Sequence, residues 1–209
     1  EQILDMIRLF ADATRRAIQA GYDGVEIHGA NTFLLQQFFS PHSNRRTDEW
    51  GGSREKRAKF PLAVLAAIQQ VIEEEKAENF IVGYRFSPEE LEEPGINFED
   101  TMYLLNQLAK KKPDYFHFSM GAYTRSSIID GDDSEPLIVK YLALRSPELA
   151  TIPIMGVGSI LQYEDAADAL AIGYDLIAVG KGFLVEPDWV QQINARKEVI
   201  DYAHVNAQQ

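Results

Sequence analysis

Hydrophobic and polar positions follow two patterns that alternate along the chain. Apolar side chains recur at helical spacing over residues 2–20, and Gly21 ends that pattern. A short strand is expected at 24–28, and a polar stretch over 40–53 leads to a helix for which Ser53 is a suitable N-cap. Further strands are expected at 80–86, 115–119, 152–157 and 175–179. Further helices are expected near 98–111, 136–144, 163–171 and 187–195.

This order of elements predicts the fold class. A helix followed by five units of strand and helix indicates an α/β protein with a parallel sheet. Two architectures fit the order. One is a doubly wound five-stranded sheet, and the other is part of a (β/α)₈ barrel, the TIM barrel.

Two glycine-containing turns near the end of the chain favour the barrel. Gly158 and Ser159 follow one expected strand, and Gly180 and Lys181 follow the next. Barrels bind phosphate with the loops after their last two strands and the start of a short extra helix, here expected at 182–184. The glycines could instead serve the turns alone. A dinucleotide fingerprint is disfavoured, because the third glycine is missing and the turn comes late in the chain.

The first expected strand ends in residues that can act on a carbonyl group. His28 and Asn31 stand three positions apart at the carboxyl end of that strand, where barrel active sites gather. An imidazole and a carboxamide can together donate two hydrogen bonds to one oxygen and so polarise a carbonyl. On pattern alone, a histidine that packs in the core and an asparagine that starts a helix are an equal alternative.

Composition excludes several functions. The 209 residues carry 32 Asp and Glu against 20 Lys and Arg, a net charge of −12, which disfavours nucleic acid and anionic membranes as partners. The apolar runs around 60–68 and 176–180 are too short to span a bilayer. The chain has no cysteine, so it contains no disulfide and no thiolate ligand for a metal. This absence fits a reducing compartment such as the cytoplasm.

Several segments together resemble one enzyme family. Residues 24–41 read GVEIHGANTFLLQQFFSP, and residues 43–53 read SNRRTDEWGGS. Residues 82–88 read VGYRFSP, and residues 180–188 read GKGFLVEPD. In this order they closely resemble the old yellow enzyme family, the FMN-dependent NAD(P)H:flavin oxidoreductases and ene-reductases. The resemblance covers almost the whole chain and implies a (β/α)₈ barrel.

The resemblance also implies roles for individual residues. His28 and Asn31 match the pair that hydrogen-bonds the substrate carbonyl, or a phenolate inhibitor, above the flavin. Arg85 matches the basic residue beside the flavin pyrimidine edge, where a fixed cation favours the reduced flavin. The alternative for Arg85 is an ion pair with the acidic cluster at 89–93. The residues that match the FMN phosphate site are Gly158, Ser159, Gly180 and Lys181.

Three positions depart from the family pattern. Lys181 stands where the family usually has arginine, so the charge is kept but the bidentate fork is lost. Ser159 replaces the second glycine of the phosphate turn and keeps its backbone N–H. Phe33 stands where the family usually has the tyrosine assigned as proton donor to the substrate carbon, and phenylalanine cannot donate a proton.

The resemblance further predicts the extent of the protein. Residues 1–209 are expected to form a single domain, the C-terminal five βα units of an FMN-binding barrel, with three more strands upstream of Glu1. The expected cofactor is FMN, with NADH or NADPH as reductant. The expected partner is a small electron acceptor, such as an activated alkene or a quinone, and a homo-oligomer is left open. Two alternatives remain: a flavin-free barrel acting on a phosphorylated small molecule, and a non-catalytic FMN-binding relative.

Overall fold

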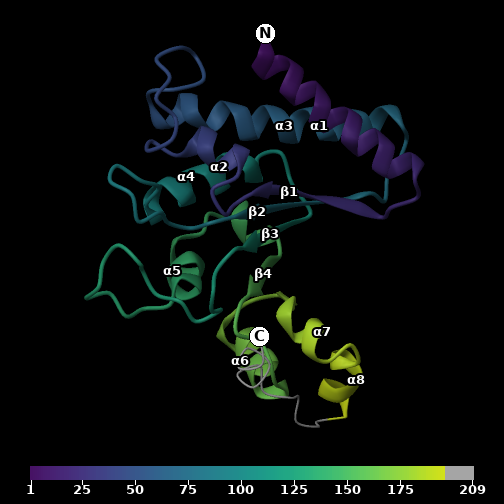
Figure 1. The fold of residues 1–209 in the computed structure, drawn as a ribbon, viewed down its shortest axis with the longest axis vertical. Helices are drawn as coiled ribbons and strands as arrows, with labels where there is room; N and C mark the ends of the chain where they lie inside the picture. Colours follow the sequence, from purple (N-terminus) through teal and green to yellow (C-terminus); the bar gives the residue numbers. More distant parts are fainter. Residues whose placement is uncertain (196–209) are drawn as a thin grey trace.

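The computed structural model describes residues 1–195 and shows alternating helices and strands (Figure 1). The strands are β1 (Gly24–Gly29), β2 (Ile81–Phe86), β3 (Tyr115–Phe118), β4 (Ile154–Val157) and β5 (Leu176–Ala178). The long helices are α1 (Gln2–Gln19), α3 (Arg54–Glu74), α4 (Phe98–Ala109), α5 (Leu137–Leu144) and α6 (Tyr163–Ile172). Shorter helices are α2 (Leu34–Phe39), α7 (Lys181–Val185), α8 (Trp189–Asn194) and the 3₁₀ turn at Leu149–Thr151.

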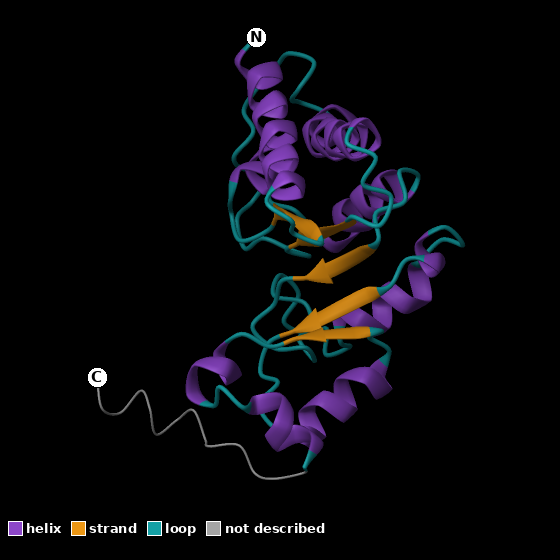
Figure 2. Ribbon diagram, turned by 90° about the vertical axis from the view of Figure 1, so that its right-hand side faces the viewer, coloured by secondary structure: helices purple, strands orange, loops and turns teal. Residues whose placement is uncertain are grey.

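The five strands form one parallel sheet in the order β1-β2-β3-β4-β5. Figure 2 shows them stacked through the middle of the molecule, with helices at both ends of the stack. A doubly wound sheet reverses its strand order at a switch point, whereas a barrel adds each new strand beside the last one. The sequential order therefore excludes the doubly wound alternative for the described residues and agrees with a segment of a barrel.

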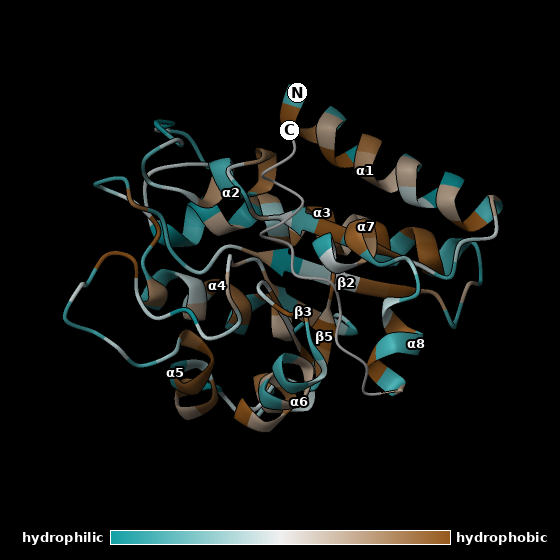
Figure 3. Ribbon diagram, turned by 60° about the horizontal axis from the view of Figure 1, so that its bottom comes forward, coloured by the Kyte–Doolittle hydropathy of each residue, from teal (hydrophilic) through white to brown (hydrophobic). Residues whose placement is uncertain are grey.

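The helices cover one face of this sheet. Their ribbons change between hydrophobic and hydrophilic positions, as expected for amphipathic helices (Figure 3). The side chains that fill the contact between helices and sheet are fully buried and include Leu65, Tyr84, Phe86, Leu105, Phe116 and Phe118. Of the described helices, none is long and apolar enough to cross a membrane.

The predicted elements agree with the observed ones apart from their ends, the helix α2 and the 3₁₀ turn at Leu149–Thr151. Ser53 is the N-cap of α3, and its side chain accepts a hydrogen bond from the backbone N–H of Lys56. The short helix expected at 182–184 begins one residue earlier, at Lys181. The sequence pattern predicts no bounds for α2, because Leu34–Phe39 is a single six-residue segment, too short to display helical periodicity.

Candidate active site

The face of the sheet opposite the helices carries a row of polar side chains. Neighbouring residues in a parallel sheet point to the same face, and His28, Arg85 and His117 are partners across β1, β2 and β3. Glu26 lies two residues before His28 and therefore shares its face. The residues at the alternate strand positions, such as Ile27 and Phe86, are buried in the core on the opposite face. Alternation along the strands thus places apolar side chains on the face that packs against the helices and polar side chains on the opposite face.

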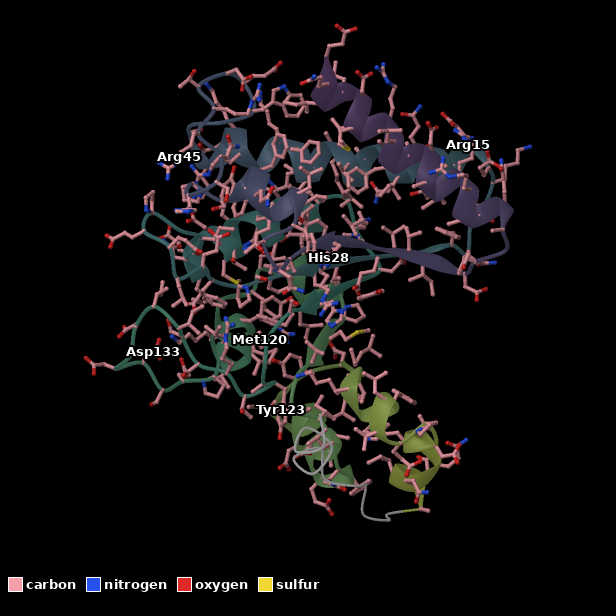
Figure 4. All side chains as sticks on the ribbon, in the orientation of Figure 1. Arg15, His28, Arg45, Met120, Tyr123 and Asp133 are labelled. Carbon is pink, nitrogen blue, oxygen red and sulfur yellow. The ribbon has the colours of Figure 1, made fainter. Side chains whose placement is uncertain are left out.

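His28 lies half-buried at the end of β1, near the centre of the molecule (Figure 4). Burial and the positive charge of Arg85 lower the pKa of His28 below its usual value of 6.5, against the opposing charge of Glu26. The ring is therefore neutral at pH 7 and carries one N–H that can donate a hydrogen bond. The exposed ring of Phe33 lies beside it, with 5.0 Å between the two ring centroids.

Asn31 lies in the turn after β1, and two serines hold it. Its backbone N–H donates to the hydroxyl of Ser87 at 2.9 Å. Its side-chain oxygen accepts a hydrogen bond of 2.9 Å from the hydroxyl of Ser119, the residue that follows β3. Because the oxygen is occupied, the carboxamide presents its NH₂ group as the donor for a ligand.

Arg85 is linked to the same serine. Its Nε donates to the Ser119 hydroxyl at 3.2 Å, so a chain of hydrogen bonds connects the guanidinium with the side chain of Asn31. The expected alternative was an ion pair with the acidic cluster at 89–93. Among the described residues no such pair forms: Glu89 contacts Ser127 and Ile128, and Glu90 accepts from groups on Gln36, Ser40 and Ile96.

The carboxylate of Glu26 lies on the same face of the sheet, one row of side chains before His28 and Arg85. Glu26 accepts a hydrogen bond from the hydroxyl of Tyr115 at 3.0 Å, and its Oε2 lies 2.8 Å from Nδ1 of His117. Burial opposes the ionisation of Glu26, but its contacts with His117 and Tyr115 outweigh burial, and the pKa of Glu26 falls below its usual value. Glu26 therefore places a negative charge beneath His28 and Arg85.

The two predicted phosphate turns lie at the carboxyl ends of β4 and β5, which are adjacent strands. Gly158 has φ +100°, and a Cβ there would lie 2.5 Å from the carbonyl oxygen of Met120, so this position requires glycine. Ser159 adopts φ 55°, and its hydroxyl donates to the carbonyl of Gly121 at 3.0 Å. Gly180 precedes α7, and Lys181 is the first residue of that helix.

An open pocket of about 400 Å³ lies beside Asn31 and Arg85, at the carboxyl edge of the sheet. It is lined by Asn31, Arg85, Ser87, Glu89, Ser119, Met120, Gly121 and Arg125. Ser87, Ser119 and Arg125 were not among the predicted site residues. The signal that could have found the two serines is their place directly after β2 and β3, since the carboxyl ends of parallel strands meet at one edge. Within the described part of the chain, no cluster of three or more His, Asp or Glu is arranged to hold a metal ion.

Comparison with known sequences identifies close relatives. Residues 1–199 match the family described as NADH:flavin oxidoreductase / NADH oxidase. The chain is 56% identical over 209 residues to an NADH:acrylate oxidoreductase of Vibrio harveyi, covering 100% of the chain and 21% of the relative. It is 56% identical over 199 residues to an NADH:fumarate oxidoreductase of Klebsiella pneumoniae strain 342, covering 95% of the chain and 22% of the relative. The chain thus spans about a fifth of the length of these two proteins.

Two solved structures share this fold over most of the chain. Morphinone reductase superposes with a TM-score of 0.73 at 26% identity, covering 95% of this chain and 50% of that one. Histamine dehydrogenase from Rhizobium sp. 4-9 superposes with a TM-score of 0.74 at 25% identity, covering 92% of this chain and 28% of that one. These likenesses confirm the predicted fold class, a part of a (β/α)₈ barrel.

Proposed function

We propose that this chain, which belongs to the NADH:flavin oxidoreductase / NADH oxidase family, is part of an FMN-dependent oxidoreductase driven by NADH or NADPH. Its acceptor is an activated alkene, a quinone or a similar small molecule. The observation that carries the proposal is the joint placement of two donors, His28 and the amide of Asn31, beside the fixed cation of Arg85. The relatives named for acrylate and fumarate agree with an unsaturated carbonyl acceptor.

The polar groups on the open face fit a phosphorylated flavin. Arg85 is the residue for the pyrimidine edge, because its guanidinium is half-buried and anchored by Ser119. The turn at Gly158 and Ser159, with Gly180 and Lys181 on the next strand, is the place for the phosphate. Bound FMN supplies the hydride chemistry, which no side chain of this chain can supply.

The chain's own part in the reaction is to hold and polarise the acceptor. The neutral imidazole of His28 and the NH₂ group of Asn31 donate to one carbonyl oxygen of the acceptor and withdraw electron density from the conjugated alkene. Ser119 keeps the carboxamide in the donor orientation before any ligand arrives, so no reorganisation is needed during the reaction. Phe33 provides an apolar wall beside His28 and no proton.

The chain is the C-terminal portion of the barrel in this proposal, and residues 1–209 belong to a single domain. β1 and β5 each have one neighbour among the described strands, so each offers a free edge to the remaining strands of a closed barrel. The turns at Gly158 and Gly180 agree with a C-terminal position in the barrel, because barrels usually bind phosphate with the loops after their last two strands.

The test uses the full-length protein that contains this chain. A protein that purifies yellow, releases FMN on denaturation and bleaches anaerobically with NADH or NADPH supports the proposal. A colourless protein that takes up no added FMN contradicts it and favours the flavin-free barrel. Bleaching without turnover of any acceptor favours a binding role alone.

A double variant tests whether His28 and Asn31 bind the oxygen of the ligand. Replacement of His28 and Asn31 by alanine removes two donors, each worth about 1.5–3 kcal/mol to a charged ligand. We expect loss of the long-wavelength absorbance band that a para-substituted phenolate gives when it binds over the flavin. An unchanged phenol affinity would show that the pair is structural.

A further inference from the structure

Arg125 is a second arginine on the pocket that contains Asn31 and Arg85, and the proposed mechanism does not use it. It lies in the loop after β3, together with Met120 and Tyr123, which lie below His28 in the view of Figure 4. The side chain is 23% exposed. Arg125 therefore borders the pocket while most of its surface is covered.

Arg125 forms an ion pair with Glu89, but its guanidinium lacks hydrogen-bond acceptors among the described residues. Its Nε and Nη2 atoms are buried and have no hydrogen-bond acceptor in the described structure. The nearby carboxylate of Glu89 lies 3.9 Å from Nη2, beyond hydrogen-bond reach. Both oxygens of Glu89 are already engaged, by the hydroxyl of Ser127 and the backbone N–H of Ile128, each at 3.0 Å. The guanidinium therefore keeps hydrogen-bonding capacity that the described part of the protein does not use.

The loop that carries Arg125 is held in place on both sides. Its backbone N–H donates to Ala122 at 3.1 Å, and its carbonyl accepts from Leu137 at 2.9 Å. The same loop is fixed to the turn after β4, because the N–H of Tyr123 donates to Gly158 at 3.0 Å. The guanidinium is thus presented from a preorganised loop, as a binding residue requires.

We propose that Arg125 binds a negatively charged group, a carboxylate or a phosphate, on the molecule that occupies this pocket. The inference rests on the proposed function, in which Arg85 faces the flavin and the electron donor or the acceptor binds beside it, toward Arg125. A planar guanidinium offers a fork of N–H groups that matches either anion. The hydroxyl of Ser87 lines the same pocket and adds a further donor, because its oxygen is the acceptor for Asn31.

The two sources of the anion make different predictions. If the group is a carboxylate of the acceptor, Arg125→Gln raises the KM for acrylate about tenfold or more and leaves the KM for methyl acrylate unchanged. If the group is a phosphate of the dinucleotide, the same variant raises the NADH concentration needed for half-maximal flavin reduction by a similar factor and affects both acceptors equally. Either result supports the anion site.

The control is Arg145→Gln in the full-length protein. Arg145 is exposed at the end of α5, so its replacement changes the net charge equally without touching the pocket. Thermal stability gives a readout that does not depend on turnover. Succinate or inorganic pyrophosphate should raise the melting temperature of the wild-type protein and of Arg145→Gln, and the shift should be lost in Arg125→Gln. Arg125→Lys, which keeps the charge, should retain part of it, and it replaces the glutamine variant if that fails to fold.

Two outcomes overturn the inference. One is the absence of any stabilisation of the wild-type protein by succinate and by pyrophosphate. The other is the same KM values and the same NADH dependence in Arg125→Gln and Arg145→Gln while NADH still bleaches the flavin. Failure of the wild-type protein to bind FMN would instead contradict the proposed function, so the two failures are distinguishable.

Discussion

The hydroxyl of Ser119 donates a hydrogen bond of 2.9 Å to the side-chain oxygen of Asn31, across a sequence separation of 88 residues. The same hydroxyl accepts from Nε of Arg85 at 3.2 Å. One serine therefore connects the cation proposed for the flavin with the amide proposed for the acceptor. It also decides which end of the Asn31 amide faces the pocket, because the oxygen is already occupied.

Replacing Ser119 by alanine should weaken the binding of a phenolate to the full-length, FMN-loaded protein. The carboxamide of Asn31 loses the contact that orients it, and a single hydrogen bond of this kind contributes about 0.5–1.5 kcal/mol, a loss in affinity of roughly two- to tenfold. Titration of the long-wavelength band with a para-substituted phenol measures the change. The control is Ser127→Ala, which removes a hydroxyl that contacts Glu89 instead. Equal affinities in the two variants would contradict the role of Ser119.

Phe33→Tyr should speed up alkene reduction selectively. Reduction of an enone requires a proton at carbon in addition to the hydride, and a positioned general acid is worth roughly 10²–10⁴-fold. Phe33 lies 5.0 Å from the ring of His28, measured between centroids, so a hydroxyl added to its ring lies near the proposed acceptor site. Quinone reduction needs no proton on carbon, so its rate should stay the same. If the ratio of enone to quinone turnover is unchanged, proton delivery does not depend on this position.

The pKa of His28 should lie below 6.5 and respond to Arg85 and Glu26 with opposite signs, with a smaller lowering effect from His117. Burial and Arg85 lower the pKa, and Glu26 raises it. Arg85→Gln should therefore raise the pKa of His28, and Glu26→Gln should lower it further. Histidine ring signals followed by NMR across pH measure both shifts, with Arg145→Gln as the control that leaves the value unchanged. A His28 pKa above 6.5 in the wild-type protein would contradict a neutral donor at pH 7.

Thr32→Gly should stabilise the protein. Thr32 adopts φ 60°, directly after Asn31 at φ 56°, and a β-branched residue is strained in this left-handed region by about 1–2 kcal/mol. Glycine relieves the strain at the cost of some chain entropy, which leaves a gain of about 0.5–1 kcal/mol. Thermal unfolding measures the gain. Thr47→Gly, in the exposed loop before Ser53, is the control and should give none. A lower melting temperature for Thr32→Gly than for Thr47→Gly would show that the threonine is not strained.

Most of the fold could be predicted from the sequence because its elements are set by local patterns. The apolar runs that became β1 to β5 and the helical spacing of α1, α3 and α4 each lie within one segment. The glycine turns could be placed for the same reason, since Gly158 directly follows the apolar run of β4. The roles of His28, Asn31 and Arg85 came from a resemblance and remain proposals.

Contacts between distant loops could not be predicted. Ser119 meets Asn31 because β2 lies between β1 and β3 in the sheet, and that order is absent from any local pattern. Arg125 is likewise placed by the hydrogen bond between its loop and the turn at Gly158. The left-handed backbone conformation of Thr32 could not be predicted from the sequence either, because the position lacks glycine, the usual residue in that conformation.

The most direct test of the account is a crystal structure of the full-length protein with FMN bound. We expect the pyrimidine edge of the flavin within hydrogen-bond distance of Arg85, and the phosphate on the backbone N–H groups of the turns at Ser159 and Lys181. His28 and Asn31 should then face the acceptor side of the ring. FMN bound away from Arg85, or a phosphate held by other loops, would contradict the assignment of this edge of the sheet as the active site.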